Sequence, residues 1–148
     1  MHLKDRLQED LKAAMKSGDI ARRDAIRLIA SAIKQEEVDG QKTLGDDDVI
    51  ALLMREAKKR RDSIEEAQRF GRTETVEKEQ FELSLIESYL PQQLSREELE
   101  AEIRRAIEET GAKSAREMGN VMKVLMPRIK GRADGKLVNE MLKTLLSN

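Results

Sequence analysis

One stretch of the sequence decides how the chain is organised: ESYLPQQLSREE, residues 87–98. Pro91 has no backbone N–H and disfavours helix in the residue before it, so a helix that arrives from the N-terminal side ends near Tyr89. Ser95 and Glu98 have the spacing of a capping box, in which each side chain accepts a hydrogen bond from a backbone N–H of the first helical turn. One helix therefore ends within this stretch, and another begins.

Apolar residues recur at helical spacing on the N-terminal side of this stretch. Four buried stripes are expected there: Leu3, Leu7, Leu11 and Met15; Ile26, Ile29, Ala30 and Ile33; Val49, Leu52, Leu53, Ala57, Ile64 and Ala67; and Phe81, Leu85, Ile86 and Tyr89. No run alternates as a half-buried strand does. The sequence predicts an all-α protein whose N-terminal domain, residues 1–93, is a hairpin or bundle of about four helices.

The remaining residues, 94–148, predict a compact three-helix domain. Ser114 and Glu117 repeat the capping-box spacing, and Pro127 is expected to end the helix that they open. Asp134 is expected to cap the last helix.

The composition argues against the commonest catalytic and metal sites. The chain of 148 residues has no cysteine, and its one histidine, His2, lies at a terminus. Cys–His, Ser–His–Asp and His-rich metal sites are therefore not expected. Asp46, Asp47 and Asp48 could bind a hard cation such as Mg²⁺, but capping and the helix dipole already explain three acids at the start of a helix. We expect no catalytic residue, no metal and no cofactor.

The sequence also predicts a location. The absence of cysteine fits a reducing compartment, the N-terminus opens with charged residues, and no run approaches the roughly 18 apolar residues that a membrane span needs. We expect a soluble, cytoplasmic protein without membrane contact.

Positive charge is concentrated near the C-terminus. Residues 111–148 hold eight basic and three acidic side chains, a net charge of +5, whereas the whole chain has a net charge of -1. Arg128, Lys130, Arg132 and Lys136 lie close together among glycines, ahead of the last helix. Glycine lets backbone N–H groups approach a ligand, and a helix N-terminus attracts phosphate, so this segment predicts contact with a nucleic-acid backbone.

A second basic run, Lys58 to Arg61, is a weaker candidate for nucleic-acid binding. Consecutive helical residues point around the whole cylinder, and Asp62, Glu65 and Glu66 are near enough to form ion pairs. We interpret this run as a salt-bridged surface.

Six ordered motifs resemble the YqeY family. They are Asp10-Leu11-Lys12-Ala13-Ala14-Met15-Lys16, Arg27-Leu28-Ile29, Lys59-Arg60-Arg61-Asp62-Ser63-Ile64, Glu87 to Ser95, Met118-Gly119 and Lys130 to Lys136. The resemblance implies two helical parts, of which the second is similar to the tail domain of the B subunit of the tRNA-dependent amidotransferase. That tail contacts the outer body of the tRNA and does not perform the amidation.

The resemblance therefore implies a tRNA-binding accessory module, with tRNA and the tRNA-charging or amidotransferase machinery as partners. The implied contact residues are Lys130, Arg132 and Lys136, with Lys123 and Arg128 beside them. The catalytic parts of the amidotransferase have no counterpart here, so no independent catalysis is expected. Two alternatives stay open: a carbon–nitrogen ligase activity that uses glutamine as amide donor, alone or with an amidotransferase, and a protein-interaction module built on the methionine-rich helices or on the groove between the two halves.

Overall fold

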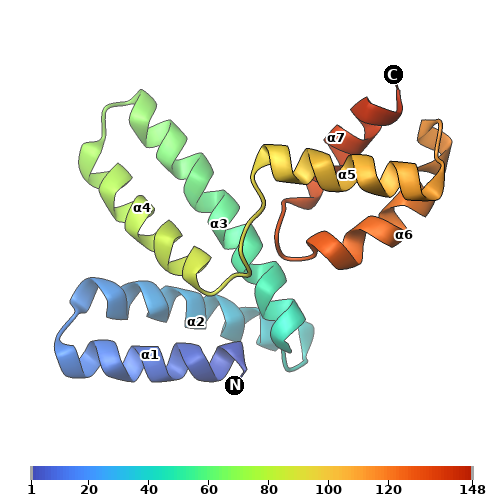
Figure 1. Ribbon diagram of the computed structural model, residues 1–148. Helices are drawn as coiled ribbons and strands as arrows, with labels where there is room; N and C mark the ends of the chain where they lie inside the picture. The colour runs from blue at the N-terminus through green and yellow to red at the C-terminus, as the bar shows by residue number, and fades with distance from the viewer. Residues whose placement is uncertain (1, 148) are drawn as a thin grey trace. The chain divides into compact units, whose positions relative to one another are not determined.

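The computed structural model describes residues 2–147 (Figure 1). Over these residues it contains seven α-helices, one short 3-10 helix and no strand. The prediction of an all-α protein is confirmed. The chain divides into two compact units, Met1–Leu90 (unit 1) and Pro91–Asn148 (unit 2). None of the described helices combines the length and the hydropathy that crossing a bilayer requires.

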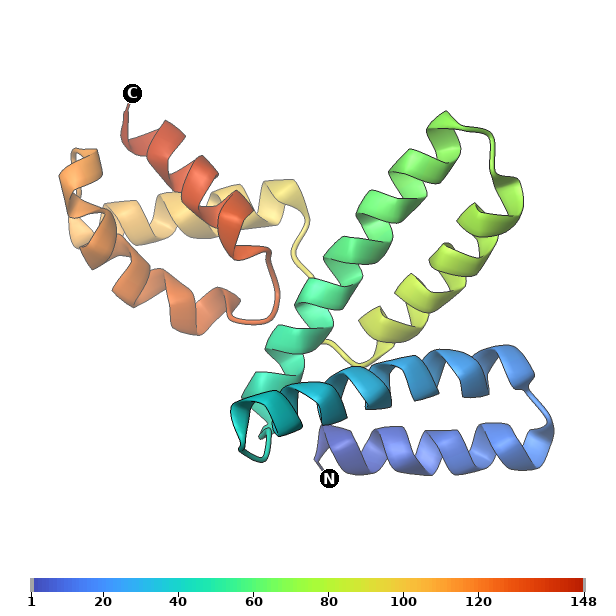
Figure 2. The same cartoon turned by 180° about the vertical axis from the view of Figure 1, so that it is seen from behind.

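Unit 1 contains two helical hairpins. Its helices are α1 (Leu3–Ser17), α2 (Ile20–Gly40), α3 (Asp46–Arg69) and α4 (Thr73–Ser88). Figures 1 and 2 show α1 beside α2 and α3 beside α4. The first hairpin turns at Gly18, whose φ of 74° lies in the left-handed region that residues with a side chain rarely adopt.

The core of unit 1 is aliphatic apart from Tyr89. Buried side chains come from all four helices and from Leu44. The Tyr89 hydroxyl donates a hydrogen bond to the Asp10 carboxylate, and the Arg6 guanidinium lies 5.0 Å from the centre of the Tyr89 ring. These contacts attach the C-terminal end of α4 to α1.

Unit 2 has its own core. It consists of α5 (Arg96–Thr110), the 3-10 helix η1 (Ala115–Glu117), α6 (Met118–Ile129) and α7 (Gly135–Leu146). The core side chains are Leu99, Ile103, Ala106, Ala112, Val121, Leu125, Ile129, Val138, Met141, Leu142 and Leu146. The predicted capping box is confirmed: the Glu98 N–H donates to Ser95 Oγ at 3.1 Å, and the Ser95 N–H donates to Glu98 Oε1 at 3.0 Å.

Two expected core positions of unit 1 were wrong. Met15 is 52% exposed, and Ala14 is buried instead. Residues spaced four apart do not stay on one face, because the helix has about 3.6 residues per turn. Met15 therefore lies about 120° around the helix from Leu3, whereas Ala14 lies only about 20° away. Phe81 is 42% exposed, while its neighbour Glu82 is buried. The reason is electrostatic: Glu82 Oε1 lies 3.5 Å from Arg60 Nε of α3.

Two predicted helix ends of unit 2 were also wrong. The Ser114 side chain accepts no capping hydrogen bond, and a 3-10 turn precedes α6. The Glu117 carboxylate instead accepts the Lys113 N–H at 3.3 Å. Pro127 lies inside α6, which continues to Ile129. A proline removes one helical hydrogen bond, but the buried Ile129 side chain holds the last turn against the core. Asp134 caps α7 as predicted, accepting the Lys136 N–H at 3.4 Å.

Candidate nucleic-acid interface

The loop between α6 and α7 is held by the segment that opens unit 2. The Leu94 N–H donates to the Arg132 carbonyl at 2.9 Å. The Gln93 side-chain amide donates to the carbonyls of Gly131, at 2.7 Å, and Pro91, at 2.9 Å. Two stretches about 40 residues apart therefore form one structure, which we call the clamped loop (residues 91–94 and 130–134).

Arg132 holds the clamped loop from its other side. Its Nε donates to the Gln92 carbonyl at 2.9 Å, and its Nη1 donates to the Arg128 carbonyl at 3.5 Å. The side chain thus joins the end of α6 to the opening segment of unit 2. Because two of its donors are engaged by carbonyls, Arg132 positions the loop, and only the rest of its guanidinium remains for an external phosphate.

Arg128 is paired with an acidic side chain of α5. Its Nη2 lies 2.5 Å from Glu109 Oε2. The hydrogen bond from Arg128 holds the pKa of Glu109 below its ordinary value of 4.5, so the carboxylate is charged at neutral pH. Its charge offsets that of Arg128. Arg128 therefore contributes little to the net positive charge of the loop.

The three lysines of the candidate set are exposed. Lys123 lies on α6, and Lys130 directly follows the last residue of that helix; Met126 and Pro127, between them in the sequence, are exposed as well. Lys136 is exposed in the first turn of α7. Neither Lys123 nor Lys136 forms a side-chain ion pair or hydrogen bond within residues 2–147. These two ammonium groups are the clearest sites for an external anion.

The surroundings favour contact with a backbone over contact with bases. All three aromatic residues of the chain precede residue 91, so unit 2 has no ring on which a base could stack. A Cβ placed on Gly135 would meet no atom within 4 Å, so the start of α7 is open on that side. Asp134 accepts one N–H of this turn, as expected from its position. Phosphate contact can position an RNA without reading its sequence.

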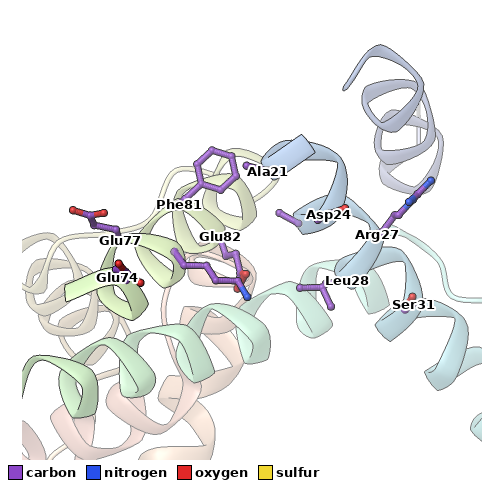
Figure 3. A pocket seen from close by; sticks show the side chains of 11 residues that line it. Ala21, Asp24, Arg27, Leu28, Ser31, Glu74, Glu77, Phe81 and Glu82 are labelled. Carbon is purple, nitrogen blue, oxygen red and sulfur yellow. The ribbon is translucent and has the colours of Figure 1, made fainter. Parts of the chain in front are cut away.

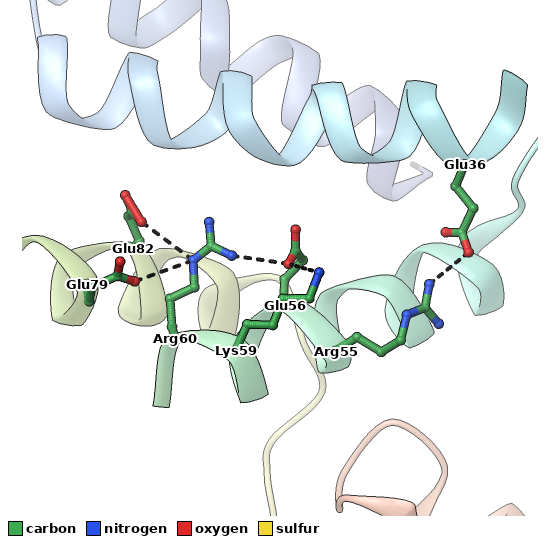
Figure 4. Close-up of polar contacts among 7 residues, drawn as sticks. All are labelled: Glu36, Arg55, Glu56, Lys59, Arg60, Glu79 and Glu82. Carbon is green, nitrogen blue, oxygen red and sulfur yellow. Dashed lines mark hydrogen bonds and ion pairs between the residues drawn. The ribbon is translucent and has the colours of Figure 1, made fainter. Parts of the chain in front are cut away.

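The second basic run is salt-bridged at Lys59 and Arg60, with partners other than those expected, whereas Lys58 and Arg61 form no ion pair with any described residue (Figure 4). Arg60 lies among Glu56, Glu79 and Glu82, at 3.2, 3.9 and 3.5 Å. Lys59 also contacts Glu56, at 3.5 Å. The expected partners Asp62, Glu65 and Glu66 form no ion pair within the described residues, because packing of α4 against α3 brings other acids nearer.

The acids at the start of α3 have structural partners. Gly45, not an aspartate, is the N-cap, and Asp46, Asp47 and Asp48 form the first turn. Asp46 accepts the Leu3 N–H at 3.0 Å and Asp48 accepts the Gly45 N–H at 3.2 Å. The hydrogen bond from Leu3 lowers the pKa of Asp46 below its ordinary 3.8. Across residues 2–147 no three acidic or histidine side chains are grouped to hold a metal ion.

Comparison with known proteins decides the family. Residues 4–146 match the sequence model described as "Yqey-like protein". The chain belongs to the YqeY-like family. Both stretches of the clamped loop of this YqeY-like protein lie within the matched range.

Curated relatives of this YqeY-like protein come from fungi and share one name, "Altered inheritance of mitochondria protein 41, mitochondrial". The relative from Pyrenophora tritici-repentis is 32% identical over 146 residues, 95% of this chain and 79% of the relative. Those from Lachancea thermotolerans and Kluyveromyces lactis are 39% identical over 87 residues and 38% over 104, covering 58% and 66% of this chain. The chain spans about half the length of these two relatives, 46% and 54%.

These names correct the predicted location. The cytoplasmic assignment is contradicted, because the relatives are named as mitochondrial proteins. It rested on the composition of the chain and its first residues, neither of which identifies a compartment.

Sequence reasoning also missed the role of Gln93. The side chain joins two loop carbonyls, yet glutamine at that position carries no local signal, since the partner carbonyl of Gly131 is 38 residues away. The only hint was that both stretches lie in motifs that resemble those of the family.

Proposed function

We propose that this YqeY-like protein is an accessory tRNA-binding module that holds the RNA backbone and performs no chemistry itself. Lys123, Lys130 and Lys136 supply the phosphate contacts, while Arg128 and Arg132 shape the surface. The observation that carries the proposal is the set of exposed lysines around the clamped loop, in the part of the chain with a charge of +5. The amidotransferase or tRNA-charging machinery is the proposed setting.

The proposal extends to the organisation of the chain. Residues 1–93 form a four-helix N-terminal domain, and residues 94–148 form a three-helix domain equivalent to the amidotransferase tail. The support is the resemblance of the motifs, together with the placement of three helices after Pro91. The names of the fungal relatives point to the mitochondrion as the compartment in which such a module works.

The affinity should be moderate and strongly dependent on salt. Removal of one phosphate contact reduces the slope of log affinity against log salt by about 0.7 to 0.9 in magnitude. Three lysines therefore account for about 2 to 3 units of slope. The net charge of -1 over the whole chain limits any long-range attraction of RNA, so the contacts act locally.

Filter binding of unmodified tRNA at several salt concentrations tests the site. The variant K123A/K130A/K136A is expected to lose most of the affinity at low salt. Its matched control is K12A/K16A/K34A, which removes the same charge from three exposed lysines of unit 1 outside both basic runs. Equal binding by the wild type and the first variant would remove the proposed site, and equal loss in both variants would show attraction by net charge alone.

A second assay separates binding from catalysis. The protein is incubated with glutamine and a misacylated tRNA in the absence of other subunits. We expect neither release of ammonia nor amidated product. Product that depends on the protein would contradict the non-catalytic part of the proposal while leaving the binding site untouched.

A further inference from the structure

The positive charge of unit 1 is gathered around the turn between α1 and α2. Residues 12–28 hold five basic and two acidic side chains, a net charge of +3. The rest of residues 1–90 holds twelve basic and eighteen acidic side chains, a net charge of -6. Figures 1 and 2 show this turn at the outer end of the hairpin that α1 and α2 form. A cationic region on an otherwise acidic unit favours contact with an anionic partner.

Most of this positive charge is not neutralised within the protein. Arg22 lies 4.0 Å from Asp10, and Arg23 lies 2.9 Å from Asp24. Asp19 forms no ion pair with a described residue, and its carboxylate accepts the Arg22 N–H at 3.1 Å as the cap of α2. Three exposed cations have no acidic partner across the described part of the chain: Lys12, Lys16 and Arg27. The turn therefore has two more unpaired cations than unpaired acids.

Two large apolar side chains are exposed beside these cations. Met15 of α1 is 52% exposed, and Ile20 of α2 is 60% exposed. Arg27 extends from α2 away from Phe81 and toward α1, where its Nη2 lies 4.0 Å from Met15 Sδ (Figure 3). Ile20 and Arg27 are seven residues apart, so they lie only about 20° apart around α2. Apolar and cationic groups therefore share this end of unit 1, which we call the hairpin end (Lys12, Met15, Lys16, Ile20 and Arg27).

The combination of charge and apolar surface selects among anionic partners. An RNA backbone would pair with the cations but leave Met15 and Ile20 exposed, because bases stack on aromatic rings and these side chains are aliphatic. A second copy docked by the same end would bring like charges together. A protein interface buries about 800 Å² on each partner, far more than two side chains at a turn supply.

The surface of an anionic bilayer accepts both kinds of side chain. Apolar groups at a membrane surface enter the boundary between headgroups and acyl chains, and nearby lysines and arginines pair with lipid phosphates. The bilayer requires no matched shape, so a convex turn with two apolar side chains can engage it. The long stems of lysine and arginine also keep their charged ends at headgroup level while an apolar neighbour enters more deeply.

We propose that the hairpin end binds the surface of a membrane that contains anionic phospholipid. Met15 and Ile20 enter the interfacial layer, and the three cations pair with lipid phosphates. The sequence expectation of no membrane contact rested on the lack of an apolar run long enough to span, and contact with a surface needs no such run. The proposal goes beyond RNA binding and can hold or fail independently of the interface in unit 2.

Sedimentation of the full chain with phospholipid vesicles tests the proposal. Vesicles of phosphatidylcholine with about 30% phosphatidylglycerol should bind the protein about tenfold or more tightly than vesicles of phosphatidylcholine alone. The variant K12Q/K16Q/R27Q should weaken binding about fivefold for each cation lost at low salt, with a smaller effect at high salt. M15S/I20S should weaken binding about tenfold or more at both salt concentrations, because salt does not screen the apolar contribution.

Matched substitutions elsewhere in unit 1 serve as controls. V38S/F70S alters two apolar residues that are 60% and 67% exposed, and K42Q/K58Q/R61Q removes three exposed cations. Both variants should bind the vesicles as the wild type does. All the substituted side chains are exposed, so the circular dichroism spectrum should not change.

Exchange of variants between the two assays separates this proposal from RNA binding. K123A/K130A/K136A should keep most of the vesicle binding, and M15S/I20S should keep the tRNA binding. Equal vesicle binding by the hairpin-end and control variants would overturn the proposal, as would a wild type that binds neither kind of vesicle. Vesicle binding lost only in K123A/K130A/K136A would assign it to unit 2 instead. Loss of tRNA binding but not of vesicle binding in K12Q/K16Q/R27Q would make the hairpin end an RNA contact.

Discussion

Replacement of Arg132 should separate residues that shape the loop from residues that contact RNA. Its guanidinium joins the Gln92 carbonyl, at 2.9 Å, to the Arg128 carbonyl, at 3.5 Å. A hydrogen bond from a charged donor contributes about 1.5 to 3 kcal/mol. The side chain is only half-buried and its second bond is long, so we expect Arg132→Ala to cost about 1 to 2 kcal/mol.

Two further substitutions divide charge from hydrogen bonding at this position. Arg132→Gln keeps a donor that can reach the Gln92 carbonyl and loses the charge. Arg132→Lys keeps the charge but presents a point charge where the carbonyls need a planar fork. If Arg132 positions the loop, the glutamine variant should be the more stable of the two, with a salt slope for tRNA binding within about 0.3 of the wild type.

The assay for stability is hydrogen exchange of the Leu94 amide. This N–H donates to the Arg132 carbonyl at 2.9 Å and so reports opening of the clamped loop directly. We expect about tenfold faster exchange in Arg132→Ala, the equivalent of about 1.4 kcal/mol. Unchanged exchange, or a salt slope that falls by about 0.7 or more in Arg132→Gln, would refute the reasoning and make Arg132 an RNA contact.

Three other predictions concern stability. Burial, and then the hydrogen bond to the Asp10 carboxylate, raise the pKa of Tyr89, so the folded state keeps a proton that the unfolded chain loses near pH 10. The free energy of unfolding should therefore fall above pH 10 in the wild type and change less in Tyr89→Phe. Urea unfolding across that pH range measures the difference. The backbone hydrogen bond from Ser95 lowers the pKa of Glu98 below 4.5, so the charged side chain stabilises the fold above pH 4.5, and this stabilisation is lost as the pH falls below that value. The melting temperature should therefore fall less on acidification in Glu98→Gln than in the wild type. Arg60→Ala should lower the free energy of unfolding, measured by thermal unfolding, by about 3 kcal/mol, because it leaves the buried Glu82 without its cation. The double variant Arg60→Met with Glu82→Leu should recover part of that loss. No recovery would contradict the pairing.

Local signals were enough to predict the helices. The capping box at Ser95 and Glu98 acts within one helical turn, so neighbouring residues determine it. The same reasoning failed at Pro127, because burial of Ile129 outweighs one missing hydrogen bond. It also failed for Phe81 and Glu82, where a partner 22 residues away decides which side chain is buried.

The candidate interface was predictable as a set of charges but not as a geometry. The sequence by itself determined that positive charge gathers after residue 110, that no aromatic ring accompanies it and that glycines interrupt it. Only the tertiary structure decided that Arg128 pairs with Glu109 and that Arg132 holds backbone carbonyls, while Lys123 and Lys136 stay available. The physical reason is that the type of a residue fixes its charge, whereas neutralisation of that charge depends on which opposite charges folding brings within about 4 Å.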